Sequence, residues 1–304
     1  MNSVQISHIT KSYGNVTAVR DISLSINSGE LFALIGPDGA GKTTLFRMLT
    51  TLLLPDKGDA TVCGLDMRKD WRQIRTISGY MPGRFSLYQD LSVEENLEFF
   101  ATVFKTTIQE NYDLIHDIYV QLEPFSKRRA GKLSGGMKQK LALCCALIHR
   151  PRVLFLDEPT TGVDPVSRKE FWDILSRIKE QNITIIVSTP YMDEASRCDR
   201  IALMRNGSCL RTDTPEQICA SFPHKLWSLK GKELYQLLLD AREYPQTYSC
   251  HAFGDCHHFI FKEENDKADD LAAYLRMKGH EDVLIERLEP SVEDCFMDFG
   301  EDDQ

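Results

Sequence analysis

The chain begins with short apolar stretches separated by turn residues, which is the pattern of β-strands. VQISHIT, AVRDISLSI and LFALI fall within residues 3–35, with turns predicted at residues 13–15 and 27–30. Further along, residues 152–205 alternate strand-like VLFLD, helical FWDILSRI, and strand-like ITIIVST and RIALM. Strands that alternate with helices in this way predict parallel βαβ units in an α/β core of three layers.

From about residue 92 to residue 148 the apolar positions recur three and four residues apart, as in VEENLEFFATVF and YDLIHDIYVQL. This spacing predicts helices with one apolar face. Ser92 followed by Glu95 has the form of a capping box, so a helix is expected to begin at Val93. We therefore expect a helical subdomain at about residues 84–140.

The pattern changes after Pro215. Residues 224–245 are predicted to be helical, residues 248–261 to form two strands around a turn at 253–255, and residues 268–279 to form a helix capped by Gly279. The segment has the size of a small separate module. We expect a first domain at 1–222 and an accessory α+β module at 223–304, which ends in a solvated acidic tail, GEDDQ.

Composition narrows the functional classes. The 304 residues are 42% hydrophobic and carry a formal net charge of −9, which allows a sizeable core and disfavours a nucleic-acid partner. The N-terminus does not have the pattern of a signal peptide, so the nine cysteines are expected to be reduced thiols in a cytosolic protein. No apolar run approaches the roughly 20 residues that cross a bilayer, so any membrane role is expected to be peripheral.

A glycine-rich loop carries the strongest chemical signal. Gly36, Gly41, Lys42 and Thr43 match G-x-x-x-x-G-K-[ST] between an apolar strand and a helical stretch. Backbone N–H groups of such a loop surround a triphosphate, the lysine reaches its β and γ oxygens, and the hydroxyl holds Mg²⁺. The alternative is an ordinary glycine turn. The strand and helix on either side favour a nucleoside triphosphate site.

Two further motifs follow in the chain. VLFLDE is an apolar strand ending in Asp157 and Glu158; the first carboxylate can bind Mg²⁺ and the second can orient or deprotonate water, although two surface acids at a strand end would look the same. LSGGMKQ precedes a helical stretch, and Ser134, Gly135 and Gly136 can present a hydroxyl and backbone amides to a second anion.

Together with the phosphate loop and LDEPTTGVD, LSGGMKQ resembles the ATP-binding cassette (ABC) ATPases over about residues 3–220. The resemblance implies a P-loop α/β core with an N-terminal antiparallel β subdomain and a helical subdomain. It also implies ATP and Mg²⁺ as ligands, with Thr43 and Asp157 at the metal and Glu158 as the catalytic residue. The implied ATP contacts are the stacking ring of Tyr13 and the phosphate-binding residues Gly36, Pro37, Asp38, Gly39, Ala40, Gly41, Lys42, Thr43 and Thr44.

In this family two cassettes close head to tail around ATP. The resemblance therefore implies that Ser134, Gly135 and Gly136 act in trans on a nucleotide held by a second cassette, with Asp164 at the dimer seam. It also implies separate transmembrane permease subunits, which would place this chain on the inner face of the cell membrane. The ending LEPSVEDCFMDF is similar to that of cassettes from drug and polysaccharide exporters, which favours export.

Two positions depart from the family pattern. Gly83 stands where similar cassettes carry a glutamine that contacts Mg²⁺ and water, and Pro190 stands where they carry a histidine that contacts the γ-phosphate. We interpret this site as one that binds ATP and hydrolyses it slowly, paired with a second cassette rather than with its own copy. The arrangement resembles the first cassette of tandem drug-exporter ATPases. The alternative is that neighbouring groups compensate for both changes.

Two other kinds of cassette protein are alternatives. A soluble cassette acting on ribosomes or DNA would be expected to carry a charged linker or a large insertion, and a non-hydrolysing regulatory cassette would share every binding motif. Cys250-His251 and Cys256-His257-His258 have the residue types of a zinc site but not its usual spacing, so metal binding there is disfavoured. The adjacent Cys144 and Cys145 are expected to be core residues.

Overall fold

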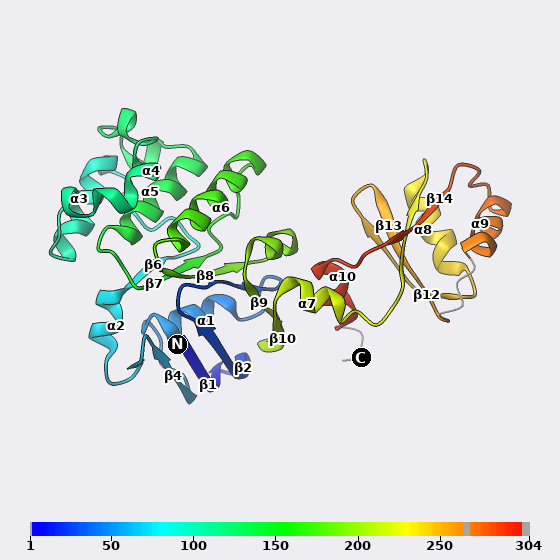
Figure 1. Cartoon of the computed structure of the whole chain (residues 1–304), viewed down its shortest axis with the longest axis horizontal. Helices are drawn as coiled ribbons and strands as arrows, with labels where there is room; N and C mark the ends of the chain where they lie inside the picture. The colour runs from blue at the N-terminus through cyan, green and yellow to red at the C-terminus, as the bar shows by residue number, and fades with distance from the viewer. Residues whose placement is uncertain (1, 264–267, 300–304) are drawn as a thin grey trace. The chain divides into compact units, whose positions relative to one another are not determined.

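The computed structural model describes residues 2–263 and 268–299 (Figure 1). The chain divides into two compact units between Pro215 and Glu216. This division falls at the start of α7 (Pro215–Ala220), whereas the boundary expected from the sequence lies after that helix. The acidic end, residues 300–304, lies outside the described residues. Within the described part, every helix is too short or too polar to span a bilayer.

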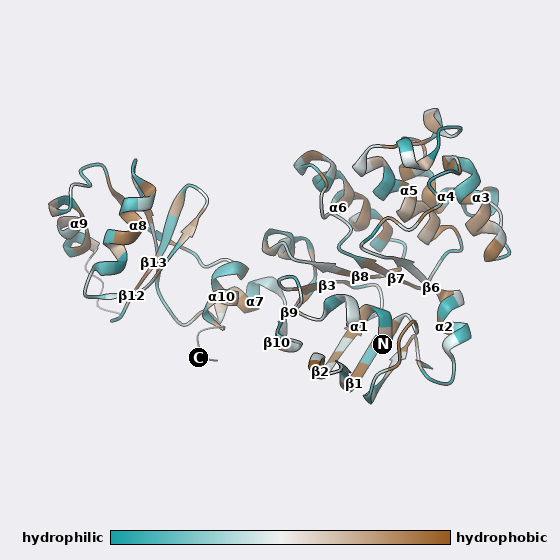
Figure 2. Ribbon diagram, turned by 180° about the vertical axis from the view of Figure 1, so that it is seen from behind, coloured by the Kyte–Doolittle hydropathy of each residue, from teal (hydrophilic) through white to brown (hydrophobic). Residues whose placement is uncertain are grey.

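A six-stranded sheet forms the centre of the first unit, in the order β10-β9-β3-β8-β7-β6. The other five strands run parallel to one another, and β10 at the edge pairs antiparallel with β9. The strands are β3 (Leu31–Ile35), β6 (Ser78–Met81), β7 (Val153–Asp157), β8 (Thr184–Thr189), β9 (Arg200–Arg205) and β10 (Ser208–Asp213). β3, β7 and β8 are buried along their whole length because both faces of a parallel sheet are covered; Figure 2 shows β7 and β8 as hydrophobic ribbons. The predicted parallel α/β core is confirmed.

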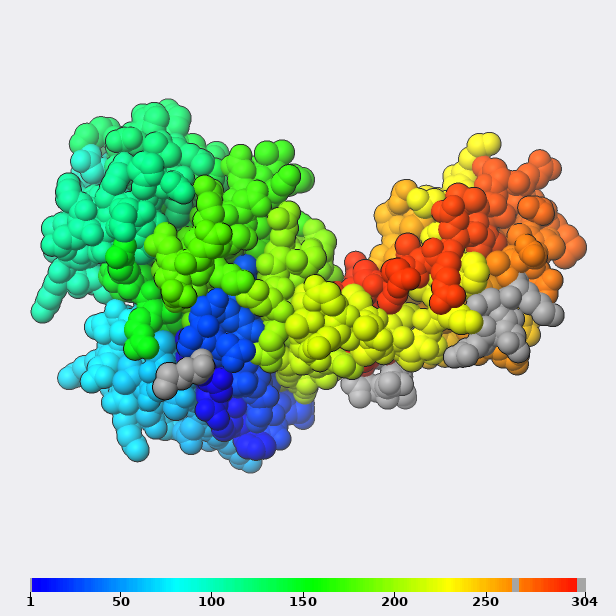
Figure 3. Space-filling model, viewed as in Figure 1, coloured from blue at the N-terminus to red at the C-terminus, as the bar shows by residue number. Residues whose placement is uncertain are grey.

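A second, antiparallel sheet has the order β2-β1-β4-β5. It confirms the predicted N-terminal β subdomain, and Figure 3 shows its N-terminal strands in blue beside the cyan segment that follows α1. Its strands are β1 (Asn2–Tyr13), β2 (Val16–Asn27), β4 (Lys57–Val62) and β5 (Leu65–Asp66). Helix α1 (Lys42–Leu49) contributes Leu45, Phe46 and Met48 to a core cluster shared with both sheets.

The helical segments of the first unit follow the expected order. Ser92 caps α3 through both halves of a capping box with Glu95, so the helix begins at Val93 as predicted. A capping box satisfies two backbone N–H groups that would otherwise lack partners. These segments are α2 (Trp71–Ile77), α3 (Val93–Val103), η1 (Gln109–Asn111), α4 (Tyr112–Tyr119), η2 (Glu123–Phe125), η3 (Ala130–Lys132), α5 (Gly135–Leu147), α6 (Pro165–Lys179) and η4 (Met192–Arg197).

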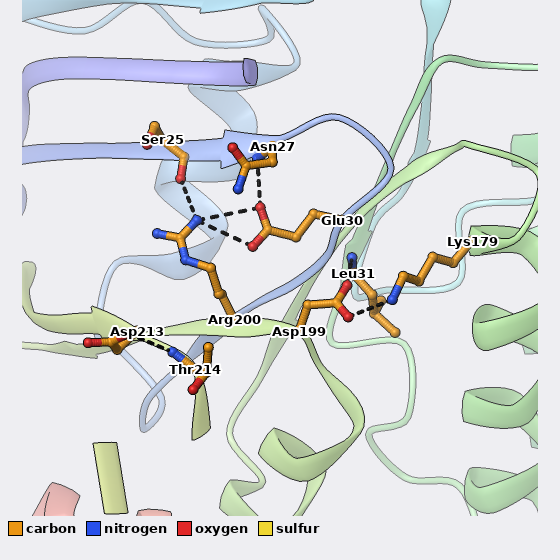
Figure 4. A network of polar contacts seen from close by, with 9 residues as sticks. All are labelled: Ser25, Asn27, Glu30, Leu31, Lys179, Asp199, Arg200, Asp213 and Thr214. Atoms are coloured by element: carbon orange, nitrogen blue, oxygen red, sulfur yellow. Dashed lines mark hydrogen bonds and ion pairs between the residues drawn. The ribbon is translucent and has the colours of Figure 1, made fainter. Parts of the chain in front are cut away.

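Polar contacts fix the start of β3, the strand that leads into the glycine-rich loop (Figure 4). Asp199 accepts a hydrogen bond from the Leu31 backbone N–H at 2.8 Å and pairs with Lys179 at 2.5 Å. Arg200 donates to the Glu30 carboxylate at 3.3 Å. Glu30 is buried, and a buried charge needs such a partner. Together these contacts hold β3 against β9 at the end opposite the loop.

The second unit is a β-α-β-β-α-β module with an antiparallel sheet in the order β12-β13-β11-β14. Its elements are β11 (Leu226–Lys230), α8 (Leu234–Glu243), β12 (Thr247–Phe253), β13 (Cys256–Phe261), α9 (Ala268–Met277), β14 (Leu284–Leu288) and α10 (Val292–Asp298). One sheet face packs on α8 and α9 around Leu229, Phe259 and Leu271. The predicted hairpin is confirmed, and so is the helix end at Gly279, whose φ is 101°.

The prediction of continuous helix over residues 224–245 is wrong. Residues 226–230 form β11, a central strand that pairs with β13 on one side and β14 on the other. Leu226 and Leu229 are three residues apart, which also suits a helix, so local spacing could not separate the two. Pairing on both edges decided the outcome.

The cysteine and histidine residues of 250–258 are split between the two faces of the module's sheet. His251 lies opposite His258 in the β12–β13 pair, while His257 Nε2 lies 2.6 Å from the Leu234 carbonyl oxygen. Among the described residues, no three His, Cys, Asp or Glu side chains are grouped as a metal site requires. All nine cysteines are free thiols.

Asp294 anchors α10 to the sheet. Its carboxylate lies 2.6 Å from His258 Nδ1 and also accepts from the Ser291 hydroxyl and backbone N–H. Burial acts to raise the pKa of Asp294, but the contacts with His258 and Ser291 outweigh it and the pKa lies below its ordinary value. The charged carboxylate therefore stabilises the folded module.

We expect Asp294→Asn to lower the free energy of unfolding of this module by about 1–3 kcal/mol near neutral pH. Because the folded pKa is the lower one, the contribution is complete above about pH 4 and is lost as the pH falls through the folded pKa. Hydrogen exchange of the β13 amides measures the loss. The exposed Asp255→Asn serves as control, and a difference that grows on acidification would contradict the account.

Candidate nucleotide-binding site

The loop between β3 and α1 needs its glycines for steric reasons. A Cβ on Gly36 would lie 2.1 Å from the Met204 carbonyl oxygen, and one on Gly41 would lie 2.2 Å from that of Ala18. Gly41, with φ of 99°, is also the N-cap of α1, and no side chain caps this end. Backbone N–H groups at such a helix start remain available to an anion.

Lys42 lies inside the loop, with 3% of its surface exposed. Its ammonium group donates to the carbonyl oxygens of Gly36 at 2.7 Å and Pro37 at 3.0 Å, and lies 3.4 Å from Glu158 Oε1. The residues of the loop tip, Asp38 and Gly39 included, are exposed. The geometry places a fixed cation where phosphate oxygens would enter.

Thr43 and Asp157 come together although they are far apart in the sequence. The Thr43 hydroxyl donates to Asp157 Oδ1 at 3.0 Å, and the Ser188 hydroxyl donates to the same oxygen at 2.6 Å. Hydroxyl and carboxylate oxygens are the hard ligands that Mg²⁺ binds, usually with phosphate oxygens and water completing the shell. These residues therefore fit a nucleotide-bound Mg²⁺.

Glu158 has a left-handed backbone conformation, with φ of 49°. Its N–H donates to both the carbonyl oxygen and the hydroxyl of Ser188, each at 3.0 Å. Its carboxylate remains partly exposed beside Lys42. A carboxylate fixed at the mouth of a phosphate loop can orient water or take its proton.

The two departures noted in the sequence lie beside these carboxylates. A Cβ on Gly83 would be 3.1 Å from the Asp157 carbonyl oxygen, so residue 83 borders the site. Pro190 follows Thr189, the last residue of β8. The Thr189 carbonyl oxygen accepts a hydrogen bond from the Gly36 N–H at 3.2 Å. Neither Gly83 nor Pro190 offers a side-chain hydrogen bond to a phosphate or to water.

The remaining predicted residues lie on other elements. Tyr13, at the end of β1, is 48% exposed, and the Lys11 ammonium lies 6.0 Å from the centre of its ring. Ser134 is the N-cap of α5 and accepts from the Met137 N–H. A Cβ on Gly136 would lie 3.0 Å from the Ser167 hydroxyl. Within the described residues no hydrogen bond joins Ser134–Gly136 to the phosphate loop.

Sequence reasoning missed two residues beside the carboxylates. Ser188 pairs with Asp157 in the parallel β7–β8 register, a neighbour that the strand assignments alone could have suggested. Tyr80 on β6 pairs with Phe155; burial and the nearby Asp157 charge raise the pKa of Tyr80 to about 12. No local motif marks Tyr80.

A central parallel sheet with a phosphate loop after β3 and an acidic pair at the end of β7 defines a P-loop nucleotide-binding protein. The family model described as ABC transporter matches residues 19–161. The probable multidrug ABC transporter ATP-binding protein YbhF of Escherichia coli is 39% identical over 92% of this chain and 49% of that protein, so the chain spans about half of its length.

The Nod factor export ATP-binding protein I of a Rhizobium species is 37% identical over 97% of this chain and 96% of that protein. Among solved structures, cbiO1 from Clostridium perfringens, described as part of the ABC transporter complex cbiONQ, shares 26% identity and a TM-score of 0.65 over 72% of this chain and 91% of that chain. The chain belongs to the ABC transporter family as an ATP-binding domain.

Proposed function

We propose that this chain is the ATP-binding subunit of an exporter and couples ATP binding and hydrolysis to transport through separate permease subunits. The observation that carries the proposal is the phosphate loop with Lys42 buried inside it and Glu158 beside it. The relatives named for multidrug transport and for Nod factor export support the export direction. The transported substrate stays unassigned.

In this proposal the residues divide the work. Gly36–Thr44 bind the phosphates, Lys42 neutralises their charge, Thr43 and Asp157 hold Mg²⁺, and Tyr13 stacks on the base. The metal would supply charge neutralisation at the phosphates. Glu158 receives the proton of the attacking water, while Ser188 holds both carboxylate residues in place through Asp157 Oδ1 and the Glu158 N–H.

The signature residues are proposed to act on a nucleotide held by a second cassette. Ser134 and Gly135 are exposed at the start of α5, where the helix dipole and backbone N–H groups favour an anion. Asp164 caps the neighbouring α6 and is also exposed. Both helix starts are therefore accessible to a partner, as a head-to-tail pair requires.

A cleft of about 240 Å³ in the first unit is the proposed docking site for a cytoplasmic helix of the permease. Its lining is mainly apolar and includes Leu52, Met81, Phe85, Leu87, Phe100 and Phe104. Leu52 is 55% exposed. Exposed apolar side chains beside an apolar cleft are typical of a protein-binding surface. Amphipathic helices commonly bind in grooves of this kind.

Gly83 and Pro190 lead us to propose that this chain's own site turns over slowly and that it pairs with a second, different cassette. The signature residues stay intact, so the chain can complete a competent site around the partner's nucleotide. Hydrolysis would then be faster at that composite site. We place the protein at the cytoplasmic face of the membrane, with no nucleic-acid partner.

The assembled transporter tests this asymmetry. We expect Glu158→Gln to leave ATPase activity within about twofold of the unmodified complex, because the faster site uses the partner's own carboxylate. The matched Glu→Gln change in the partner cassette should abolish turnover. Near-total loss from Glu158→Gln would contradict the asymmetry, and MgATP binding without turnover in the unmodified complex would favour a regulatory cassette that uses ATP only as a clamp. Recovery of the chain with ribosomes instead of permease-containing membranes would overturn the exporter assignment.

A further inference from the structure

A buried carboxylate lies just behind the proposed site and takes no part in the roles assigned so far. Glu194, in η4, is 3% exposed, and the two threonines that it contacts, Thr160 and Thr189, are 1% and 0% exposed. The Thr160 hydroxyl donates to Glu194 Oε1 at 2.9 Å and the Thr189 hydroxyl to Oε2 at 2.5 Å. Arg168 Nε lies 3.3 Å from Oε1. Both oxygens of the buried Glu194 carboxylate therefore have partners, which offsets the cost of removing its charge from water.

These contacts connect two segments that border the nucleotide. Thr160 lies two residues after Glu158, in the loop that leads to Asp164 and α6. Thr189 ends β8 and precedes Pro190. The Thr189 hydroxyl also accepts from the Tyr191 N–H at 3.1 Å, which fixes the turn around Pro190. We call Thr160, Thr189 and Glu194 the threonine–glutamate clasp.

Glu158 needs such support because of its backbone. The left-handed region is sterically unfavourable for a non-glycine residue, and the surrounding structure must hold it there. On the N-terminal side, the carbonyl oxygen and the hydroxyl of Ser188 both accept from the Glu158 N–H. On the C-terminal side, the Thr161 N–H donates to the Glu158 carbonyl oxygen at 3.2 Å, and the adjacent Thr160 is held by the clasp.

We propose that Glu194 is a positioning residue: through Thr160 and Thr189 it holds Glu158 in the left-handed conformation that directs its carboxylate toward Lys42. The inference rests on the proposed function of Glu158 and adds Glu194, which lies outside the motifs identified in the sequence. The backbone carbonyl of Thr189 accepts from the Gly36 N–H of the phosphate loop, whereas the hydroxyls of Thr160 and Thr189 bond to Glu194. Removing the Thr160 hydroxyl leaves that backbone contact in place, so we expect the change to act on the hydrolytic step and to leave ATP affinity to the loop.

Thr160→Val tests the clasp, because valine keeps the shape of threonine and removes only the hydroxyl donor. We expect the single-turnover rate of MgATP hydrolysis by the full chain to fall about 10-fold, with the dissociation constant for MgATP within twofold of the unmodified value. Thr160→Ser, which keeps the hydroxyl, should restore the rate. An unchanged rate in Thr160→Val, or a parallel loss of MgATP affinity, would overturn the positioning role.

Hydrogen exchange gives a second readout that needs no turnover. In Thr160→Val the amides of Glu158 and Thr161 should exchange at least 10-fold faster, whereas Thr160→Ser should leave them unchanged. Equal protection in all three proteins overturns the clasp even where hydrolysis is too slow to follow. Failure of the proposed function is a different result, since it appears as absence of MgATP binding in the unmodified chain.

Discussion

The double variant Gly83→Gln/Pro190→His is expected to hydrolyse bound ATP about 10²-fold faster than the unmodified chain, with little change in ATP affinity. Loss of one side chain that contacts the transition state typically lowers a rate by about 10²–10³-fold. Two such contacts in one site do not act additively, so we expect the double change to gain roughly what one contact supplies. We expect the hydrolysis rate to change and the ATP affinity to stay the same, because neither substitution lies in the phosphate loop.

The structure indicates how the two side chains would be accommodated. A Cβ at residue 83 meets the Asp157 carbonyl oxygen at 3.1 Å, so the exposed segment around Gly83 must shift by a few tenths of an ångström. Gly83 is not among the residues with positive φ, and a glutamine can therefore adopt its backbone conformation. Pro190→His restores a backbone N–H and adds an imidazole at the end of β8.

Single-turnover hydrolysis with enzyme in excess measures the effect, beside each single change. Adding Lys42→Met to the double variant is the matched control, because a gain that arises at this site must disappear with it. Brisk hydrolysis by the unmodified chain would contradict the prediction. It would mean that neighbouring groups compensate for Gly83 and Pro190, and a homodimeric transporter ATPase would become the better interpretation.

The parts of the site that follow from local chemistry could be predicted from the sequence. A glycine-rich loop between an apolar strand and a helix leaves few alternatives, and the structure places Lys42, Thr43, Asp157 and Glu158 in one group. The apolar runs of β7 and β8 predicted buried parallel strands because such strands are covered on both faces. The capping box at Ser92 likewise depends only on residues three apart.

Contacts between distant segments could not be predicted in the same way. Thr160 and Glu194 are 34 residues apart in the chain, and only the packing of η4 against the loop after β7 brings them together. The same limit explains the error at residues 226–230, where pairing with two other strands outweighed a helix-like spacing. The residues that bind phosphate can be recognised from the local sequence, whereas the contacts that position Glu158 depend on tertiary packing.

Lys42→Met is expected to weaken MgATP binding by about 10–100-fold. Methionine keeps the apolar stem of lysine and removes the charge, and hydrogen bonds from charged groups contribute about 1.5–3 kcal/mol each. The effect should persist in high salt, because Lys42 is 3% exposed and buried charges are screened little. Calorimetric titration with MgATP measures it, and thermal unfolding reports whether the variant remains folded.

The exposed Lys57→Met is the matched control and should bind MgATP like the unmodified chain. Removing Lys42 also leaves Glu158 without the cation 3.4 Å away, so the same variant should lose hydrolysis beyond its loss of affinity when MgATP is saturating. An affinity within threefold of the unmodified value would contradict the role of Lys42 in the phosphate loop. Retained affinity with lost turnover would instead assign Lys42 to the orientation of Glu158, and the proposed division of work between the loop and the carboxylates would have to be reversed.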